Sequence, residues 1–173
     1  EVNEIRHFVA GSDLIIFTSG AEWQVNSGQD SAFEASTIKQ KPQSYWGCSH
    51  HSPILVGNTI LFAQTNNAQV RSLGFSLQLN GYAGGYTGTD MNLLASHIFQ
   101  TATIADWAFA RSPNQLVYVV RSDGTLATMT FQQEQEVIAW ARWDTLGKFE
   151  KVEVLGHSET QVDDAVYFVV KRT

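Results

Sequence analysis

Three side chains that commonly bind metals lie close together in the first half of the chain: Cys48, His50 and His51. A Cys-x-His pair can touch a metal ion, but zinc sites normally need three or four ligands at a recognisable spacing. The remaining histidines are scattered along the sequence, at positions His7, His97 and His157. We therefore expect no bound metal and no cofactor, and we assign no metal-ligating or cofactor-binding residue.

The residues just before this group favour a structural interpretation. Tyr45 and Trp46 are expected to fill space where the chain crosses from one structural unit to the next, and Gly47 allows close backbone approach. Cys48 is the only cysteine, so no internal disulfide can form. This is compatible with folding in a reducing cytoplasm.

Two glutamates, Glu134 and Glu136, are candidates for a general acid and base. In a strand, however, residues i and i+2 share one face, where like charges repel, so a solvated sheet edge is the favoured interpretation. His97 is interpreted as a partly exposed helix residue rather than a catalytic base. The sequence has no Gly-x-Ser-x-Gly elbow. We assign no catalytic residue, although a pair brought together only by folding would be invisible in the sequence.

A glycine-rich stretch at Asn80–Asp90 invites comparison with phosphate-binding loops. No Gly-Lys-Ser/Thr ends it, and the spacing of a dinucleotide-binding loop is absent. Directly after it, Met91, Leu94 and Ile98 recur at helical spacing. This spacing predicts a short helix at about residues 90–99, with the three apolar side chains on one side.

The element around which the chain is organised is the hairpin predicted at Gln115–Phe131. Two runs rich in branched and aromatic residues flank Ser122-Asp123-Gly124, and Asp-Gly between such runs is a strong hairpin signal because glycine reaches positive φ at no steric cost. The first arm, Leu116–Val120, is almost continuously apolar, which predicts a strand covered on both faces. The second arm alternates, which predicts that it is less buried.

The same pattern of strand, turn and strand recurs along the chain. Its copies begin at Asp13, Asn58, Gln115 and Asp164, roughly 45, 57 and 49 residues apart. A four-stranded propeller blade repeats every ~40–50 residues. Because one blade cannot cover its own faces, such repeats stack against neighbours.

A candidate strand precedes each hairpin: Ile5–Ala10, Ser52–Val56, Ile104–Arg111 and Phe149–Leu155. Two further segments are candidate outer strands, Ser36–Gln40, which Pro42 closes, and Glu134–Trp143, where Val137, Ile138 and Trp140 favour a strand over a helix. We predict a single all-β domain over residues 1–173, a β-propeller-like array of about three to four antiparallel blade sheets with one short inserted helix at about residues 90–99. The blade-like units are expected at about residues 1–40, 52–79, 101–143 and 149–173.

The composition is that of an ordinary globular protein, with 173 residues, 43% apolar, 16% charged and a net charge of −6. Without a cluster of Lys and Arg, the chain is not expected to bind nucleic acid directly. No run approaches the ~18 apolar residues of a membrane span, so no membrane is expected as a partner. The chain starts without Met and stops inside a repeat, which favours a piece of a longer protein.

Several short sequence segments, in this order, are similar to an internal region of large virion proteins of tailed bacteriophages and prophages. They are Pro42–Cys48, Val70–Phe75, Asn92–His97, Ile104–Trp107, Val120–Leu126, Glu134–Trp140 and Asp164–Phe168, and they cover most of the chain from Lys41 onward. The resemblance implies a tail or head-neck role of the nozzle or stabilisation type, without catalytic residues. It also implies a virion protein made in the cytoplasm of a bacterial host.

We therefore expect a non-catalytic structural or assembly module of a phage particle. Its partners would be other virion proteins or the remaining parts of its own longer chain, and it would form a homo-oligomer in the particle. Two alternatives stay open. One is a carbohydrate- or protein-binding propeller, for which Trp143 beside Asp144 is the best glycan-binding candidate; the other is a hydrolase on the same fold.

Overall fold

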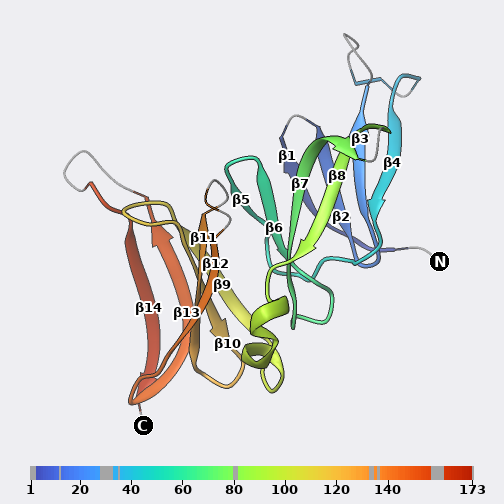
Figure 1. Ribbon diagram of the computed structural model, residues 1–173. Coiled ribbons are helices and arrows are strands. Elements are labelled where there is room, and N and C mark those ends of the chain that lie inside the picture. The colour runs from blue at the N-terminus through green and yellow to red at the C-terminus, as the bar shows by residue number, and fades with distance from the viewer. Residues whose placement is uncertain are drawn as a thin grey trace. The chain divides into compact units, whose positions relative to one another are not determined.

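The computed structural model describes residues 3–11, 13–27, 33–34, 36–79, 82–132, 135, 137–156 and 162–172. Within these residues the fold is all-β with one short named helix, and the chain divides into two compact units, Glu1–Asp90 and Met91–Thr173 (Figure 1). Each unit contains two antiparallel sheets in which consecutive strands are neighbours. The expected all-β fold of antiparallel sheets with one short inserted helix is thus confirmed for the described residues.

The first unit contains two four-stranded sheets. The first sheet has the order β1-β2-β3-β4 and the second the order β5-β6-β7-β8. Their strands are β1 Ile5–Ala10, β2 Leu14–Thr18, β3 Glu22–Asn26, β4 Lys39–Ser44, β5 Ile54–Val56, β6 Thr59–Ala63, β7 Val70–Leu79 and β8 Tyr82–Asp90.

The core of the first unit draws side chains from both of its sheets. Phe17 on β2 and Phe62 on β6 are fully buried, and their ring centroids lie 5.1 Å apart. The rest of this cluster consists of Ile15, Cys48, Ile60, Leu73 and Tyr86, with Val9 packed against it. Burying apolar surface at ~25 cal/mol per Å² is the main stabilising contribution, and neither sheet could obtain it alone.

The second unit begins with the helix η1, Leu93–Phe99, a 3₁₀ segment interrupted at Ala95. A four-stranded sheet of order β12-β11-β10-β9 follows, and then a two-stranded sheet of β13 and β14. Their bounds are β9 Ile104–Ala110, β10 Leu116–Arg121, β11 Leu126–Gln132, β12 Val137–Trp143, β13 Gly147–Leu155 and β14 Ala165–Arg172.

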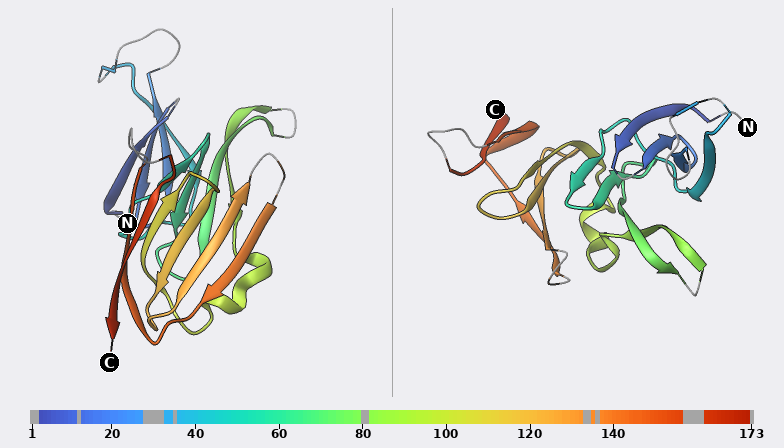
Figure 2. Two further views of the ribbon diagram at one scale, coloured as in Figure 1. Left: turned by 90° about the vertical axis from the view of Figure 1, so that its left-hand side faces the viewer. Right: turned by 90° about the horizontal axis from the view of Figure 1, so that it is seen from above.

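Aromatic contacts join the two sheets of the second unit. The Phe168 ring on β14 lies 5.7 Å from that of Tyr118 on β10 and 5.5 Å from that of Phe149 on β13, measured between centroids. Val120, Leu126 and Val152 are the buried centre of this cluster. Figure 2 shows β13 and β14 running alongside the four-stranded sheet.

The predicted hairpins are present, and the structure corrects four details around them. Residues 82–90 of the glycine-rich stretch form strand β8, which pairs with β7 over almost its whole length, so the second blade-like unit extends beyond residue 79. The outer strand predicted at Ser36–Gln40 lies instead at Lys39–Ser44 and includes Pro42. Proline is tolerated there because β4 is an edge strand, where a missing N–H costs no ladder bond.

The second arm of the central hairpin is as buried as the first, contrary to the alternation of its sequence. Leu126, Ala127 and Met129 are all fully buried. The reason is its position between β10 and β12 in the sheet. Met91, just before the helix, and Ile98 within it are buried, but the Leu94 side chain is 97% exposed, because a kinked 3₁₀ segment does not keep α-helical spacing.

A first prediction concerns Gly124, in the turn between β10 and β11. Gly124 has φ +86°, and a Cβ atom there would lie 2.7 Å from the Cβ of Lys148. We expect Gly124→Val to lower the free energy of unfolding by roughly 2–4 kcal/mol, through backbone strain and crowding. The matched control is Gly156→Val, where the new Cβ would meet only Asp164 Oδ1 at 4.0 Å. Equal denaturation midpoints for the two variants would show that the turn is not under this constraint.

Candidate functional site

The structure separates the three side chains that could have formed a metal site. Cys48 is completely buried in the core of the first unit, and burial raises the pKa of its thiol to about 12. His50, two residues later, is exposed. His7 on β1 comes near the same segment, with Nε2 3.1 Å from the carbonyl oxygen of Ser49. Among the described residues, no three His, Cys, Asp or Glu side chains are grouped as metal ligands.

A thiol with such a raised pKa stays protonated at neutral pH, and a protonated thiol is a poor nucleophile. Cys48 therefore acts as a small core residue. Its backbone N–H donates to the Thr18 carbonyl oxygen at 2.9 Å, while the next N–H, of Ser49, donates to the Ala63 carbonyl oxygen at 2.8 Å. Since Thr18 belongs to β2 and Ala63 to β6, this linker is bonded to both sheets of the first unit.

Glu22, which sequence reasoning missed, is the most unusual ionisable group of this linker region. Its side chain is completely buried on β3. Oε2 accepts hydrogen bonds from Ser44 Oγ at 2.5 Å and from the backbone N–H of Trp46 at 3.3 Å. Among the described residues, none forms a hydrogen bond with the buried Oε1. Burial raises the pKa of this carboxyl above its ordinary value, although its hydrogen bonds and the charge of Arg71 oppose the shift.

Arg71 on β7 links the same region to the second sheet. Its guanidinium carbon lies 3.5 Å from the centroid of the Trp46 ring, a cation–π arrangement, and its Nε donates to Gln64 Oε1 at 3.0 Å. Trp46 thus packs against Arg71 of the second sheet but remains 43% exposed, and the Tyr45 side chain is 74% exposed, so neither ring is buried as a space-filling residue would be. Because Glu22 is completely buried, we interpret Glu22, Trp46 and Arg71 as residues that connect the two sheets of the first unit, and not as a site open to substrate.

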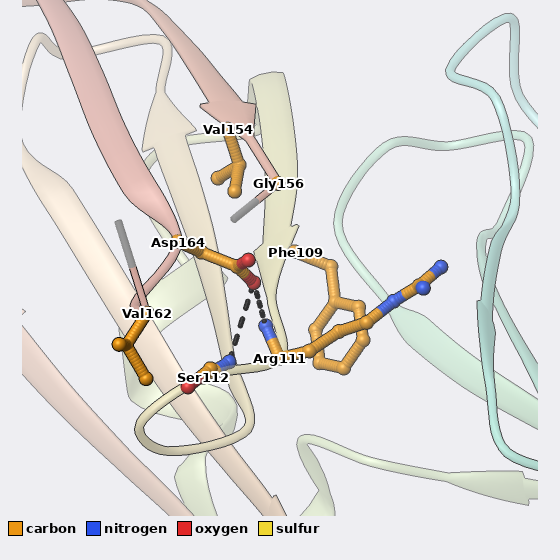
Figure 3. Close-up of a pocket in the computed structure, with 7 residues that line it drawn as sticks. All are labelled: Phe109, Arg111, Ser112, Val154, Gly156, Val162 and Asp164. Carbon is orange, nitrogen blue, oxygen red and sulfur yellow. Dashed lines mark hydrogen bonds between the residues drawn. The ribbon is translucent and has the colours of Figure 1, made fainter. Parts of the chain in front are cut away.

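An open groove lies in the second unit, where β9 and β13 end and β14 begins (Figure 3). It is lined by Phe109, Arg111, Ser112, Val154, Gly156, Val162 and Asp164. Asp164 organises it, because its Oδ2 accepts hydrogen bonds from the backbone N–H groups of Arg111 at 2.6 Å and Ser112 at 3.2 Å. The Asp164 N–H in turn donates to the Ser112 carbonyl oxygen at 3.2 Å.

The groove brings a carboxylate, a guanidinium and apolar side chains to one place. The Asp164 carboxylate is occupied by backbone donors, and Figure 3 shows the Arg111 guanidinium extending away from it. Phe109, Val154 and Val162 supply apolar surface. Together these groups form a partly apolar surface beside one guanidinium and one carboxylate, a lining of the kind that binding sites commonly have.

The remaining candidates fall at the outside of the second unit or beyond the described residues. Trp143, at the end of β12, is 51% exposed, and its Nε1 donates to Thr128 Oγ1 at 3.2 Å. The neighbouring Asp144 forms an exposed ion pair with Arg142, with 3.2 Å between Oδ1 and Nη2. His97 is exposed on η1, as predicted. The suggested pair of Glu134 and Glu136 lies outside the described residues, as does His157.

Comparison with known proteins adds no assignment, since no protein-family model matches the chain and no curated protein matches its sequence. Within the part of the chain that the structure describes, every helix is too short or too polar to cross a membrane.

Proposed function

We propose that this chain is a non-catalytic structural or assembly module of a tailed-phage or prophage particle, in its tail or head-neck region. The resemblance of several sequence segments to large virion proteins supports the assignment to a phage. Repeated antiparallel sheets joined by short connections support a structural role, because such arrays offer extended surfaces to neighbouring proteins. The proposed partners are other virion proteins and further copies of the chain, within the particle.

The observation that carries the assembly role is the exposure of large apolar side chains on strands at sheet edges. On β1, Ile5 is 55% exposed and Phe8 62%. On β14, Tyr167 is 57% and Val169 56% exposed. Edge strands with exposed apolar side chains are prone to pair with other chains, and folded proteins normally protect them unless a partner covers them.

Particle fractionation tests this proposal. Antibodies raised against the purified chain would be used on particles from an induced culture of the source strain, separated on a density gradient. We expect the chain to co-sediment with the particles, and gold-labelled antibodies to mark the tail or the neck. A host cytoplasmic protein serves as the control that must stay in the soluble fraction. If the chain stays there as well, the proposal is wrong.

A glycan-binding role is the second candidate, and the half-exposed Trp143 favours it. A tryptophan face held by a hydrogen bond to Thr128 and flanked by the charged pair of Arg142 and Asp144 is a suitable platform for a sugar ring. Screening the chain and its Trp143→Ala variant on a glycan array distinguishes the two roles. A glycan retained by the parent and lost by the variant would favour this alternative.

A further inference from the structure

The two-stranded sheet of the second unit has a strand edge that no described segment covers. Among the described residues, the three other sheets contain four strands each, whereas β14 pairs only with β13. In Figure 1, β14, drawn in red, lies at one side of this unit. Within the part of the chain that the structure describes, no strand pairs with the other edge of β14, and the backbone N–H and C=O groups of such an edge can bond to a further strand.

The side chains of β14 determine what kind of strand fits. Val166 and Phe168 pack against the core of the second unit. Tyr167 and Val169 point to the opposite face, where more than half of each side chain is exposed. A strand added to this edge must match both faces, because directly opposite residues of an antiparallel pair point to the same side of the sheet.

The charges at the two ends of β14 identify the strand that fits best. Asp163 and Asp164 directly precede the strand, and Lys171 and Arg172 end it. An antiparallel partner must therefore begin with acidic residues and end with basic ones, and β14 itself has this arrangement.

We propose that β14 pairs with β14 of a second copy of this chain, antiparallel, about a twofold axis at Phe168. In this register Asp164 lies opposite Arg172, Val166 opposite Val170 and Tyr167 opposite Val169, each pair on one face. The interface is isologous, so each of these contacts occurs twice. The pairing requires only the sheet itself and does not depend on the phage assignment.

Sedimentation equilibrium at about 5–200 μM tests the register through its charges. We expect a reversible dimer of the chain, and we expect Arg172→Glu to weaken it about tenfold, since two Glu–Asp contacts replace two attractive ones. The matched control is Lys171→Glu, which changes the net charge equally but faces Ala165. It should shift the dissociation constant less than about threefold by the same reasoning. Equal effects of the two variants would overturn the register.

A disulfide test locates the interface directly. With cysteines at both Tyr167→Cys and Val169→Cys, mild oxidation should join two chains covalently, because opposite residues of a strand pair lie within disulfide range. The parent chain is the control, and its buried Cys48 should leave it uncrosslinked. A strictly monomeric parent chain at about 200 μM would overturn the proposal. A dimer that neither crosslinks nor responds to Arg172→Glu would place the interface elsewhere and would also overturn it.

Discussion

Substitution of Gly47 by alanine is expected to lower the free energy of unfolding of the first unit by roughly 3–5 kcal/mol, which is a large effect for the addition of one methyl group. Gly47 has φ +71°, a conformation that side chains with a Cβ rarely adopt. A Cβ atom there would also overlap the backbone of Ser19 and the hydroxyl oxygen of Thr65.

Neither neighbour of Gly47 can move away easily. The Thr65 hydroxyl donates to the Ser19 carbonyl oxygen at 2.9 Å, and the Thr65 N–H donates to the Gly47 carbonyl oxygen at 3.1 Å. Thermal or urea unfolding of Gly47→Ala, monitored by tryptophan fluorescence, measures the loss.

Gly57 provides the control for backbone strain alone. It has φ +57°, yet a Cβ atom there would meet nothing within 4 Å. Gly57→Ala should therefore cost only about 1 kcal/mol, the contribution of positive φ without crowding. If Gly47→Ala and Gly57→Ala lower stability equally, the close approach at Gly47 contributes nothing and the role assigned to it is wrong.

The close backbone approach at Gly47 and the positive φ of Gly124 were both predictable from local sequence. At Gly124 the reason is direct, because Asp-Gly between two β-branched runs has few other conformations. The first strand of each repeat was found because alternating or continuous apolar residues, bounded by turn residues, leave little choice. β1 was predicted with its observed bounds at Ile5–Ala10.

The strand β8 could not be recognised in the same way, because glycine is disfavoured in strands and the segment lacks a run of branched residues. The extended conformation of β8 depends on its pairing with β7. Pairing with the long strand β7 aligns Tyr86 with Phe75, and their rings lie 5.4 Å apart. Neighbouring structure therefore overrides local preference here, and a single sequence does not reveal this.

The buried position of Glu22 was accessible to sequence reasoning, through register rather than composition. With a turn at Ser19–Gly20, the predicted hairpin aligns Phe17 with Glu22 and Ile15 with Gln24, as observed. Opposite residues share a face, and Phe17 is an obvious core residue. Glu22 must then face the core. The burial of Glu22 could thus be predicted from Phe17, the residue opposite it in the strand pair. The groove at Asp164 joins segments about 50 residues apart, and no local pairing in the sequence predicts it.

This buried carboxyl should make stability depend on pH in a specific direction. Because burial raises the pKa of Glu22, the folded state holds a proton that the unfolded state has released once the pH exceeds the ordinary carboxyl pKa of 4.5. The contribution of Glu22 to stability is therefore complete below that pH and is lost as the pH rises through the folded-state pKa.

The Glu22→Gln variant removes this titration while keeping the shape of the side chain and an oxygen that can accept from Ser44 and Trp46. We expect equal stability of variant and parent near pH 4, and an advantage of on the order of 1 kcal/mol for the variant near pH 8, where the parent carries the cost of a buried carboxylate with one unpaired oxygen. Urea unfolding at both pH values measures the difference.

Glu22→Ala should behave in the opposite way, which separates loss of charge from loss of hydrogen bonds. It removes the acceptor for Ser44 Oγ and the Trp46 N–H and leaves an unfilled volume in the linker region. We expect a loss of about 2–4 kcal/mol in the free energy of unfolding at both pH 4 and pH 8. If Glu22→Gln is destabilising at pH 8 by a similar amount, the carboxylate is ionised and well compensated in the folded protein, and the linker is held by a charge rather than by neutral hydrogen bonds.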